Sequence, residues 1–364
     1  MNLSFQKLFY VIATVFALFA ILVLAKSILI PLSVALLISF ILYPFVKKLE
    51  SWGVNKAFAA FLSIFTVFLI VGGVIFFFST QIIKLSVEFS NFQDSILLSF
   101  TDITLYINKN VPFIQDLEKN ELFEWLKNWL TESTGALVSK SISDTTAFLA
   151  GLLATTVFTF LILIYRKGLT SGFAEFASED NRAKVLKMFK SVQQVGQKYL
   201  LGMVLLVIVI GLTNSIGLWI IGIDNPFLFG FLGATLSIIP YIGTVLGAII
   251  PIVYAFVSTN SVWMPMAVAI LFWAVQLVTD NFLTPKIVGS SLRINALTAI
   301  LSLIVGAVVW GVAGMILFLP FAAMLKVVCE EFEALKPVAL LIGNQNYQEN
   351  EEKESSVHKW FKKA

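Results

Sequence analysis

The sequence predicts an all-α polytopic membrane protein with six to eight membrane helices. Of its 364 residues, 58% are hydrophobic and only 13% are charged, whereas soluble domains carry roughly 25% charged residues. Eight apolar windows, each at least long enough for a helix to cross a bilayer and two of them too long for one comfortable span, follow one another along the chain. Two of them, residues 226–257 and 296–328, hold glycine and proline near their centres, where a straight membrane helix would break. We therefore expect two broken or re-entrant segments, together with an extracytoplasmic helical hairpin.

The other six windows have the ordinary composition of membrane helices and cover residues 8–25, 28–46, 57–80, 146–165, 200–221 and 262–279. Lysine and arginine are concentrated in the loop after the second window and in the segment after the fourth, and such loops stay in the cytoplasm. The long segment between the third and fourth windows is mainly acidic. This alternation predicts that both termini are cytoplasmic.

These features predict six parts along the chain. Residues 1–83 form the first three membrane helices, 84–146 an extracytoplasmic amphipathic helical insert, and 147–165 the fourth membrane helix. Residues 166–199 form a cytoplasmic amphipathic segment, 200–328 a transport core with both broken segments, and 329–364 a cytoplasmic tail. Asn344 to Glu354 lacks apolar periodicity and is rich in Glu, which is typical of a mobile tail.

Apolar periodicity indicates helices in both segments outside the membrane. In the insert it predicts an outward helix that ends near Pro112 and a second amphipathic helix around Leu126. In the cytoplasmic segment the apolar residues form a seam at three- and four-residue steps: Val185, Met188, Val192, Val195 and Tyr199. This seam predicts a helix that lies on the inner leaflet or packs against copies of itself in an oligomer.

The two broken segments are built alike. The first holds Pro240, Tyr241, Gly243, Gly247 and Pro251; the second holds Gly306, Gly311, Gly314 and Pro320. Paired broken segments in two halves of a chain indicate a transporter site, whereas the alternative is a kinked packing helix with a small-residue seam. Each segment either crosses once, which gives eight spans, or re-enters as a hairpin, which gives six.

Few polar side chains lie within or beside the apolar windows. Asp280 is a functional candidate, because an intramembrane carboxylate is expensive to bury unpaired, and it could couple proton movement to solute movement. It opens the turn-rich stretch DNFLTPKIVG, which also contains Asn281, Pro285, Lys286 and Gly289. Lys286 could instead pair with Asp280. Asn214 and Gln276 are either interhelical hydrogen-bonding residues or ligands on a transport path.

Several functional classes have no candidate residues. The single cysteine, Cys329, and the single histidine, His358 in the polar tail, leave no zinc site or Ser/His/Asp triad to propose. No phosphate-binding loop of the GxxxxGK[ST] type occurs, and the lysines and arginines are too dispersed for a nucleic-acid surface. We therefore expect no cofactor, no metal and no enzyme activity, and transport that runs on an ion gradient or passively.

Three stretches, SIIPYIGTVLGAIIP, DNFLTPKIVGSSLRINAL and GVAGMILFLPFAAMLKVV, resemble the signature blocks of the AI-2E family of bacterial inner-membrane permeases. The opening ILIPLSVALLISFILYPFVKKLE is similar to that family's N-terminal helix pair. The resemblance implies a multispanning, homo-oligomeric exporter. The family motif residues fall at Pro240, Tyr241, Gly243, Asp280, Asn281, Pro285, Gly289, Gly311, Gly314 and Pro320; many members have Glu where this chain has Asp280.

Three functions follow as hypotheses. The first is an inner-membrane exporter of a small solute, autoinducer-2 or a similar small polar molecule, with the two broken segments and Asp280 on its path. The second is a monovalent cation (sodium)/proton antiporter, since the resemblance links other family members to such exchange. The third is a membrane scaffold or assembly factor whose outer hairpin and cytoplasmic seam bind partners.

Overall fold

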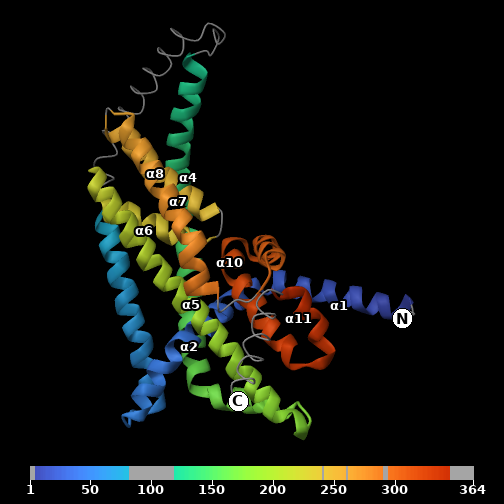
Figure 1. The fold of residues 1–364 in the computed structure, drawn as a ribbon. Coiled ribbons are helices and arrows are strands. Elements are labelled where there is room, and N and C mark those ends of the chain that lie inside the picture. The colour runs from blue at the N-terminus through green and yellow to red at the C-terminus, as the bar shows by residue number, and fades with distance from the viewer. Residues whose placement is uncertain (1–4, 82–118, 240–241, 260, 290–293, 345–364) are drawn as a thin grey trace, which may run out of the picture. The chain divides into compact units, whose positions relative to one another are not determined.

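The computed structural model describes residues 5–81, 119–239, 242–259, 261–289 and 294–344 (Figure 1). Throughout these ranges the regular elements are helices, as the sequence predicts, and Ile294 and Gly343 form an isolated antiparallel bridge. Six helices among the described residues are long and apolar enough to cross a membrane: Lys26–Ser51, Lys56–Gln81, Thr146–Glu175, Glu179–Ile221, Trp263–Val288 and Ala296–Glu331. The protein is a multi-pass helical membrane protein.

In chain order, the helices fall into an N-terminal and a C-terminal group. In the N-terminal half they are α1 (Phe5–Leu24), α2 (Lys26–Ser51), the unlabelled helix Lys56–Gln81, α4 (Lys119–Glu175) and α5 (Glu179–Ile221). In the C-terminal half they are α6 (Pro226–Leu236), α7 (Ile242–Ser258), α8 (Trp263–Val278), α10 (Ala296–Glu331) and α11 (Lys336–Ile342). Two π-helical turns, Thr279–Leu283 and Pro285–Gly289, extend α8, and a 3₁₀ turn, Glu333–Leu335, precedes α11.

The turn between α5 and α6 illustrates how local sequence sets the helix ends. Gly222 adopts φ +90° directly after α5, a left-handed conformation that ends helices and that glycine adopts without strain. Asn225 is also left-handed, with φ +53°, and asparagine tolerates this region better than most residues. Pro226 then occupies the first helical position of α6, where its missing N–H costs no hydrogen bond.

The chain divides into two compact units. One comprises Met1–Val67, Leu153–Leu206 and Thr279–Ala364; the other comprises Phe68–Leu152 and Val207–Val278. The second unit has a core in which Leu218 of α5, Phe229 of α6, Tyr254 of α7 and Phe272 of α8 are buried together. The rings of Phe229 and Tyr254 lie 4.6 Å apart between centroids, within the range of favourable aromatic pairs.

The first unit has two cores. In one, Val46 of α2 packs with Ala59 and Ala60 of the helix Lys56–Gln81 and with Leu163 of α4. In the other, Leu37 of α2 packs with Leu317 and Met324 of α10, and partly buried residues of α5 pack against them.

Part of the apolar seam of the predicted cytoplasmic segment packs within the chain. Val192 and Val195 contact the core of Leu37, Leu317 and Met324. At this point α5 can approach α2 closely because Gly196 carries no side chain: a Cβ there would stand 2.8 Å from Cδ2 of Phe40. The lysines beside the seam, Lys184, Lys187 and Lys190, are exposed as expected.

The predicted insert is only partly covered by the structure, since residues 82–118 lie outside the described ranges. From Lys119 the chain is helical, and this helix runs without interruption into the predicted fourth membrane helix, forming the 57-residue α4. The boundary that we placed between residues 146 and 147 therefore falls inside one continuous helix.

Large apolar side chains remain exposed along the membrane-length helices. On the helix Lys56–Gln81, Leu69 is 62% and Phe76 is 72% exposed, although neither would face water without a large cost. In a bilayer such surfaces contact lipid tails, so their exposure agrees with the multi-pass membrane assignment.

A candidate transport site at two glycine-pinned hairpins

The first broken segment is a helical hairpin, which we call hairpin 1 and which consists of α6 and α7. Its limbs cross where Gly233 and Gly247 meet backbone to backbone: a Cβ on Gly247 would stand 2.9 Å from both Cα and the carbonyl oxygen of Gly233. Gly243 is equally constrained, because a Cβ there would overlap the carbonyl oxygen of Leu236. The break falls between Leu236 and Ile242, so Gly243, Gly247 and the buried Pro251 all lie inside α7.

Hairpin 1 packs against α5 through a second glycine contact. Gly230 of α6 lies against Ser215 of α5, and a Cβ on Gly230 would collide with the Ser215 side chain. Ser215 is fully buried, and its Oγ donates a hydrogen bond of 2.6 Å to the Gly211 carbonyl one turn earlier. The ring of Phe231 covers Gly211 itself. At this crossing the backbones of α5 and α6 are in direct contact.

Asn214 lies on the same face of α5 as this crossing, three residues after Gly211 and next to Ser215. Its side chain is 2% exposed, and its Oδ1 has no hydrogen-bond partner within the described part of the chain. A buried acceptor left unpaired costs about 1–3 kcal/mol. Among the described residues, Asn214 Oδ1 makes no interhelical hydrogen bond, so it can accept one from a ligand.

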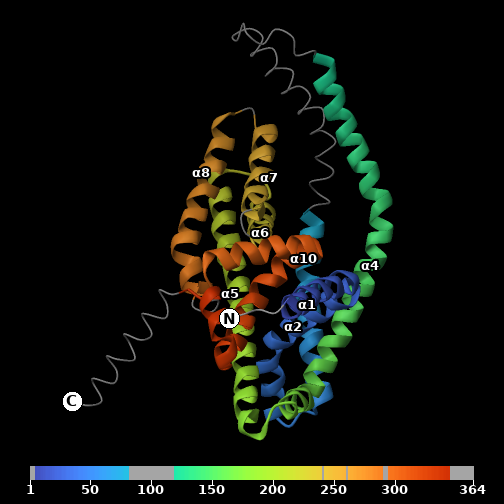
Figure 2. The same cartoon turned by 90° about the vertical axis from the view of Figure 1, so that its right-hand side faces the viewer.

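The second broken segment, α10, is also a hairpin, which we call hairpin 2. Its backbone is non-helical at Gly311 (φ +61°, ψ −138°), a conformation open essentially to glycine alone, and the limbs 296–310 and 312–331 fold back on each other there (Figure 2). Gly306 and Gly314 touch across the fold, since a Cβ on either residue would overlap the carbonyl oxygen of the other. Pro320 is buried inside the second limb, which stays helical through it.

The tip of hairpin 2 is anchored to the N-terminal helix. Trp310, the residue before the break, donates its indole N–H to the carbonyl oxygen of Leu22 at 2.9 Å. Leu22 lies in the last turn of α1, where carbonyls lack partners inside the helix. The indole ring also packs edge to face with Phe318 of the second limb, at 5.2 Å between centroids.

Asp280 and its neighbours lie in the π-helical turns after α8. Asp280 and Asn281 belong to the first turn, and Pro285, Lys286 and Gly289 to the second. Asp280, Asn281 and Lys286 are exposed, whereas Gln276 in α8 is half-buried. Within α-helices, π-helical turns are rare and often mark functional sites.

The predicted site residues are divided between the two units. Gly243, Gly247, Pro251 and Asn214 fall in one unit around hairpin 1, and Gly311, Gly314 and Pro320 fall in hairpin 2. Pro240 and Tyr241 lie outside the described residues. Sequence reasoning missed three residues of hairpin 2. Trp310 is hydrogen-bonded at its tip, and near its base Asn295 is hydrogen-bonded and Lys326 is buried.

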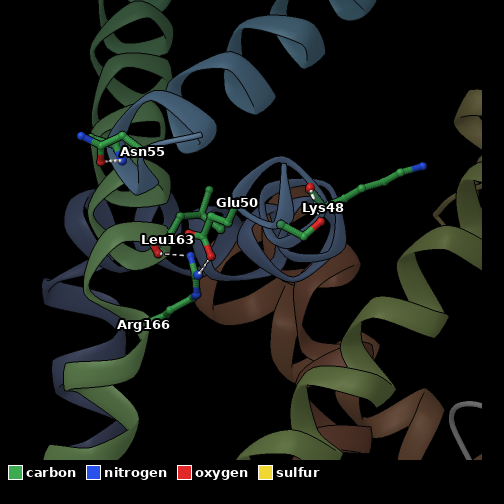
Figure 3. A network of polar contacts seen from close by, with 7 residues as sticks. Lys48, Glu50, Asn55, Leu163 and Arg166 are labelled. Carbon is green, nitrogen blue, oxygen red and sulfur yellow. Dashed lines mark hydrogen bonds and ion pairs between the residues drawn. The ribbon is translucent and has the colours of Figure 1, made fainter. Parts of the chain in front are cut away.

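An ion pair in the first unit was also missed. Arg166 of α4 pairs through Nη2 with Oε2 of Glu50 in α2, and its Nη1 donates to the Leu163 carbonyl at 2.9 Å (Figure 3). The guanidinium also lies over the ring of Tyr43, 5.5 Å from its centroid. The other Glu50 oxygen, Oε1, is buried without a partner among the described residues. This network fixes α2 against α4.

Comparison with known proteins assigns the family. The family model described as "AI-2E family transporter" matches residues 9–334. The "AI-2 transport protein TqsA" of Escherichia coli (strain K12) is 26% identical over 88% of this chain and 91% of its own length. The "Putative transport protein YrrI" of Bacillus subtilis (strain 168) is 24% identical over 84% of this chain and 87% of its own length. This chain therefore belongs to the AI-2E family of transporters.

Proposed function

We propose that this transporter exports a small polar solute, autoinducer-2 or a molecule like it, past the face of α5 that carries Asn214. The observation that carries the proposal is the unpaired, buried Oδ1 of Asn214 beside the crossing of α5 and hairpin 1. A solute hydroxyl or amine that donates to this oxygen would recover the free energy lost by leaving it unpaired. The name of the TqsA relative supports autoinducer-2 as the first solute to test.

The dimensions of hairpin 1 support a re-entrant path. The 11 residues of α6 span about 16 Å, roughly half of the hydrocarbon thickness of a bilayer. A limb of this length reaches the membrane interior and returns instead of crossing. Broken helices of this kind expose helix ends and carbonyl groups to solutes near the middle of the membrane.

Asp280 is the proposed coupling or gating carboxylate. It follows α8 directly, inside a π-helical turn of the apolar helix Trp263–Val288. This placement also favours a second candidate function, sodium/proton antiport, because a carboxylate can bind either cation. The proposal includes a location in the bacterial inner membrane, cytoplasmic termini and a homo-oligomeric state.

The test is release of labelled autoinducer-2 from liposomes that contain the purified protein, with and without an imposed proton gradient. We expect release from wild-type vesicles to exceed that from empty vesicles, and Asn214→Leu to reduce it at least tenfold. Gradient stimulation that disappears in Asp280→Asn would assign the coupling role. If release equals that of empty liposomes, signal export is refuted, and sodium-driven proton flux in the same vesicles would support the antiporter.

A further inference from the structure

The short helix α11 returns to the start of hairpin 2. The backbone N–H of Asn295, the residue before α10, donates to the carbonyl of Ile342 at 2.9 Å. Next to this bond, Ile294 and Gly343 form the antiparallel bridge. The beginning of hairpin 2 is therefore joined to the segment that follows its end, and both limbs are held together at their base.

The side chain of Asn295 makes this junction through both ends of its amide. Its Oδ1 accepts a hydrogen bond from the N–H of Thr298 at 2.8 Å and so caps the N-terminus of α10. Its Nδ2 donates to the carbonyls of Leu341, at 2.7 Å, and Gly343, at 3.2 Å. These carbonyls lie at the C-terminus of α11, where a helix has no internal donors for them.

The junction covers a buried charge. Gly343 lies against the side chain of Lys326 in the second limb, and a Cβ on Gly343 would stand 3.0 Å from Cε of Lys326. The Lys326 side chain is 5% exposed, and its Nζ pairs with Oε1 of Glu330 at 2.7 Å. Cys329, three residues further along the same face, is 2% exposed. A charge buried this deeply is stable only while its partner and its cover are in place.

We propose that α11 is a hinged cover over the buried side chain of Lys326, latched by the Asn295 amide, whose opening admits water to the base of hairpin 2. With seven residues, α11 is too short to be stable as a helix by itself. It also buries little, since Leu340 is 53% and Leu341 is 75% exposed, while Ala339 is buried. The hydrogen bonds to Asn295 thus supply much of what holds it closed. This inference is independent of the solute that the protein carries.

The sole cysteine of the chain provides the test. The rate at which a maleimide labels Cys329 in the purified full-length protein reports how often the covered face is exposed. We compare wild type with Asn295→Ala and Asn295→Asp. Aspartate caps a helix as well as asparagine does, but its carboxylate cannot donate to the carbonyls of α11. We expect both variants to label about 10- to 100-fold faster than wild type, because each loses the two hydrogen bonds from Asn295 to the carbonyls of Leu341 and Gly343.

A variant on the other side of the junction makes the test independent of Asn295. Gly343 has φ −73° and ψ 158°, which any residue can adopt, so Gly343→Ala acts only through its added Cβ. That atom would also stand 2.8 Å from the Ala339 carbonyl oxygen. We expect faster labelling of Cys329 here as well, and faster amide hydrogen exchange in residues 336–343 of all three variants.

Three results would overturn the proposal. If Asn295→Asp labels at the wild-type rate while Asn295→Ala labels faster, the residue acts only as a helix cap. If α11 exchanges faster in the variants but Cys329 labels no faster, α11 does not cover this face. If Cys329 of the wild type already labels as fast as a free thiol, the face is open without any change at the junction.

Discussion

The contact between Gly233 and Gly247 predicts that one added methyl group lowers the stability of the folded protein. In Gly247→Ala the new Cβ would stand 2.9 Å from Cα and O of Gly233, whereas carbon atoms in contact normally lie about 3.5–4.0 Å apart. The limbs of hairpin 1 must therefore separate by about 0.6–1 Å. Both neighbouring atoms belong to the backbone, so no side-chain rotation can relieve the overlap.

The expected magnitude follows from two opposing effects. Overpacking costs about 1–3 kcal/mol, and the upper part of this range applies because only the backbone can move. Alanine recovers up to about 1 kcal/mol through its higher helix propensity. The net loss of about 1–2 kcal/mol should lower the apparent Tm of the purified protein by about 1–3 °C, as measured by tryptophan fluorescence during heating in detergent.

A matched control separates the crossing from the general effect of the substitution. Gly151 in α4 has nothing within 4 Å of its Cβ position, so Gly151→Ala should leave the apparent Tm unchanged or raise it. If the two variants melt at the same temperature, the limbs of hairpin 1 do not meet at these glycines, and the reasoning from their contact is wrong.

Three further predictions concern single polar groups. Asn214→Leu should leave the apparent Tm unchanged or raise it, because it removes an unpaired acceptor, while efflux falls; a variant that unfolds would contradict the assignment of a free Oδ1. Trp310→Phe keeps the ring but loses the hydrogen bond to Leu22, so it should lower the apparent Tm by an amount equivalent to about 1 kcal/mol, with Trp219→Phe on an exposed position as control. Arg166→Met leaves Glu50 without its cation and should lower the free energy of unfolding by about 1.5–3 kcal/mol. Adding Glu50→Gln to this variant should restore part of the folded yield. If the yield does not recover, the unpaired charge is not the cause of the loss.

The helical content and both breaks could be predicted because they depend on local sequence. Apolar windows indicate membrane helices by length alone, and Gly311 marks its break by a conformation that other residues rarely adopt. The sequence could not show that Pro251 and Pro320 remain inside helices. Each proline removes one backbone donor, and the surrounding packing decides whether the helix bends or ends.

Long-range polar contacts leave no such local signal. The hydrogen bond from Arg166 to Glu50 joins residues 116 positions apart, and that from Asn295 to Leu341 joins residues 46 apart. Neither pair follows a helical period, so only the fold reveals them. The periodicity of the seam at Val192 predicts a buried face, but periodicity alone does not identify what packs against it.

The glycine contacts also limit how this chain can diverge from its relatives. At Gly243, Gly247, Gly306 and Gly314 the neighbouring atom is backbone, and every other amino acid carries a Cβ, so these positions have no conservative replacement. Relatives at 24% and 26% identity differ from this chain at about three residues in four. We expect most of these differences to lie at lipid-facing side chains. These four glycines should stay unchanged, because they maintain the shape of each hairpin.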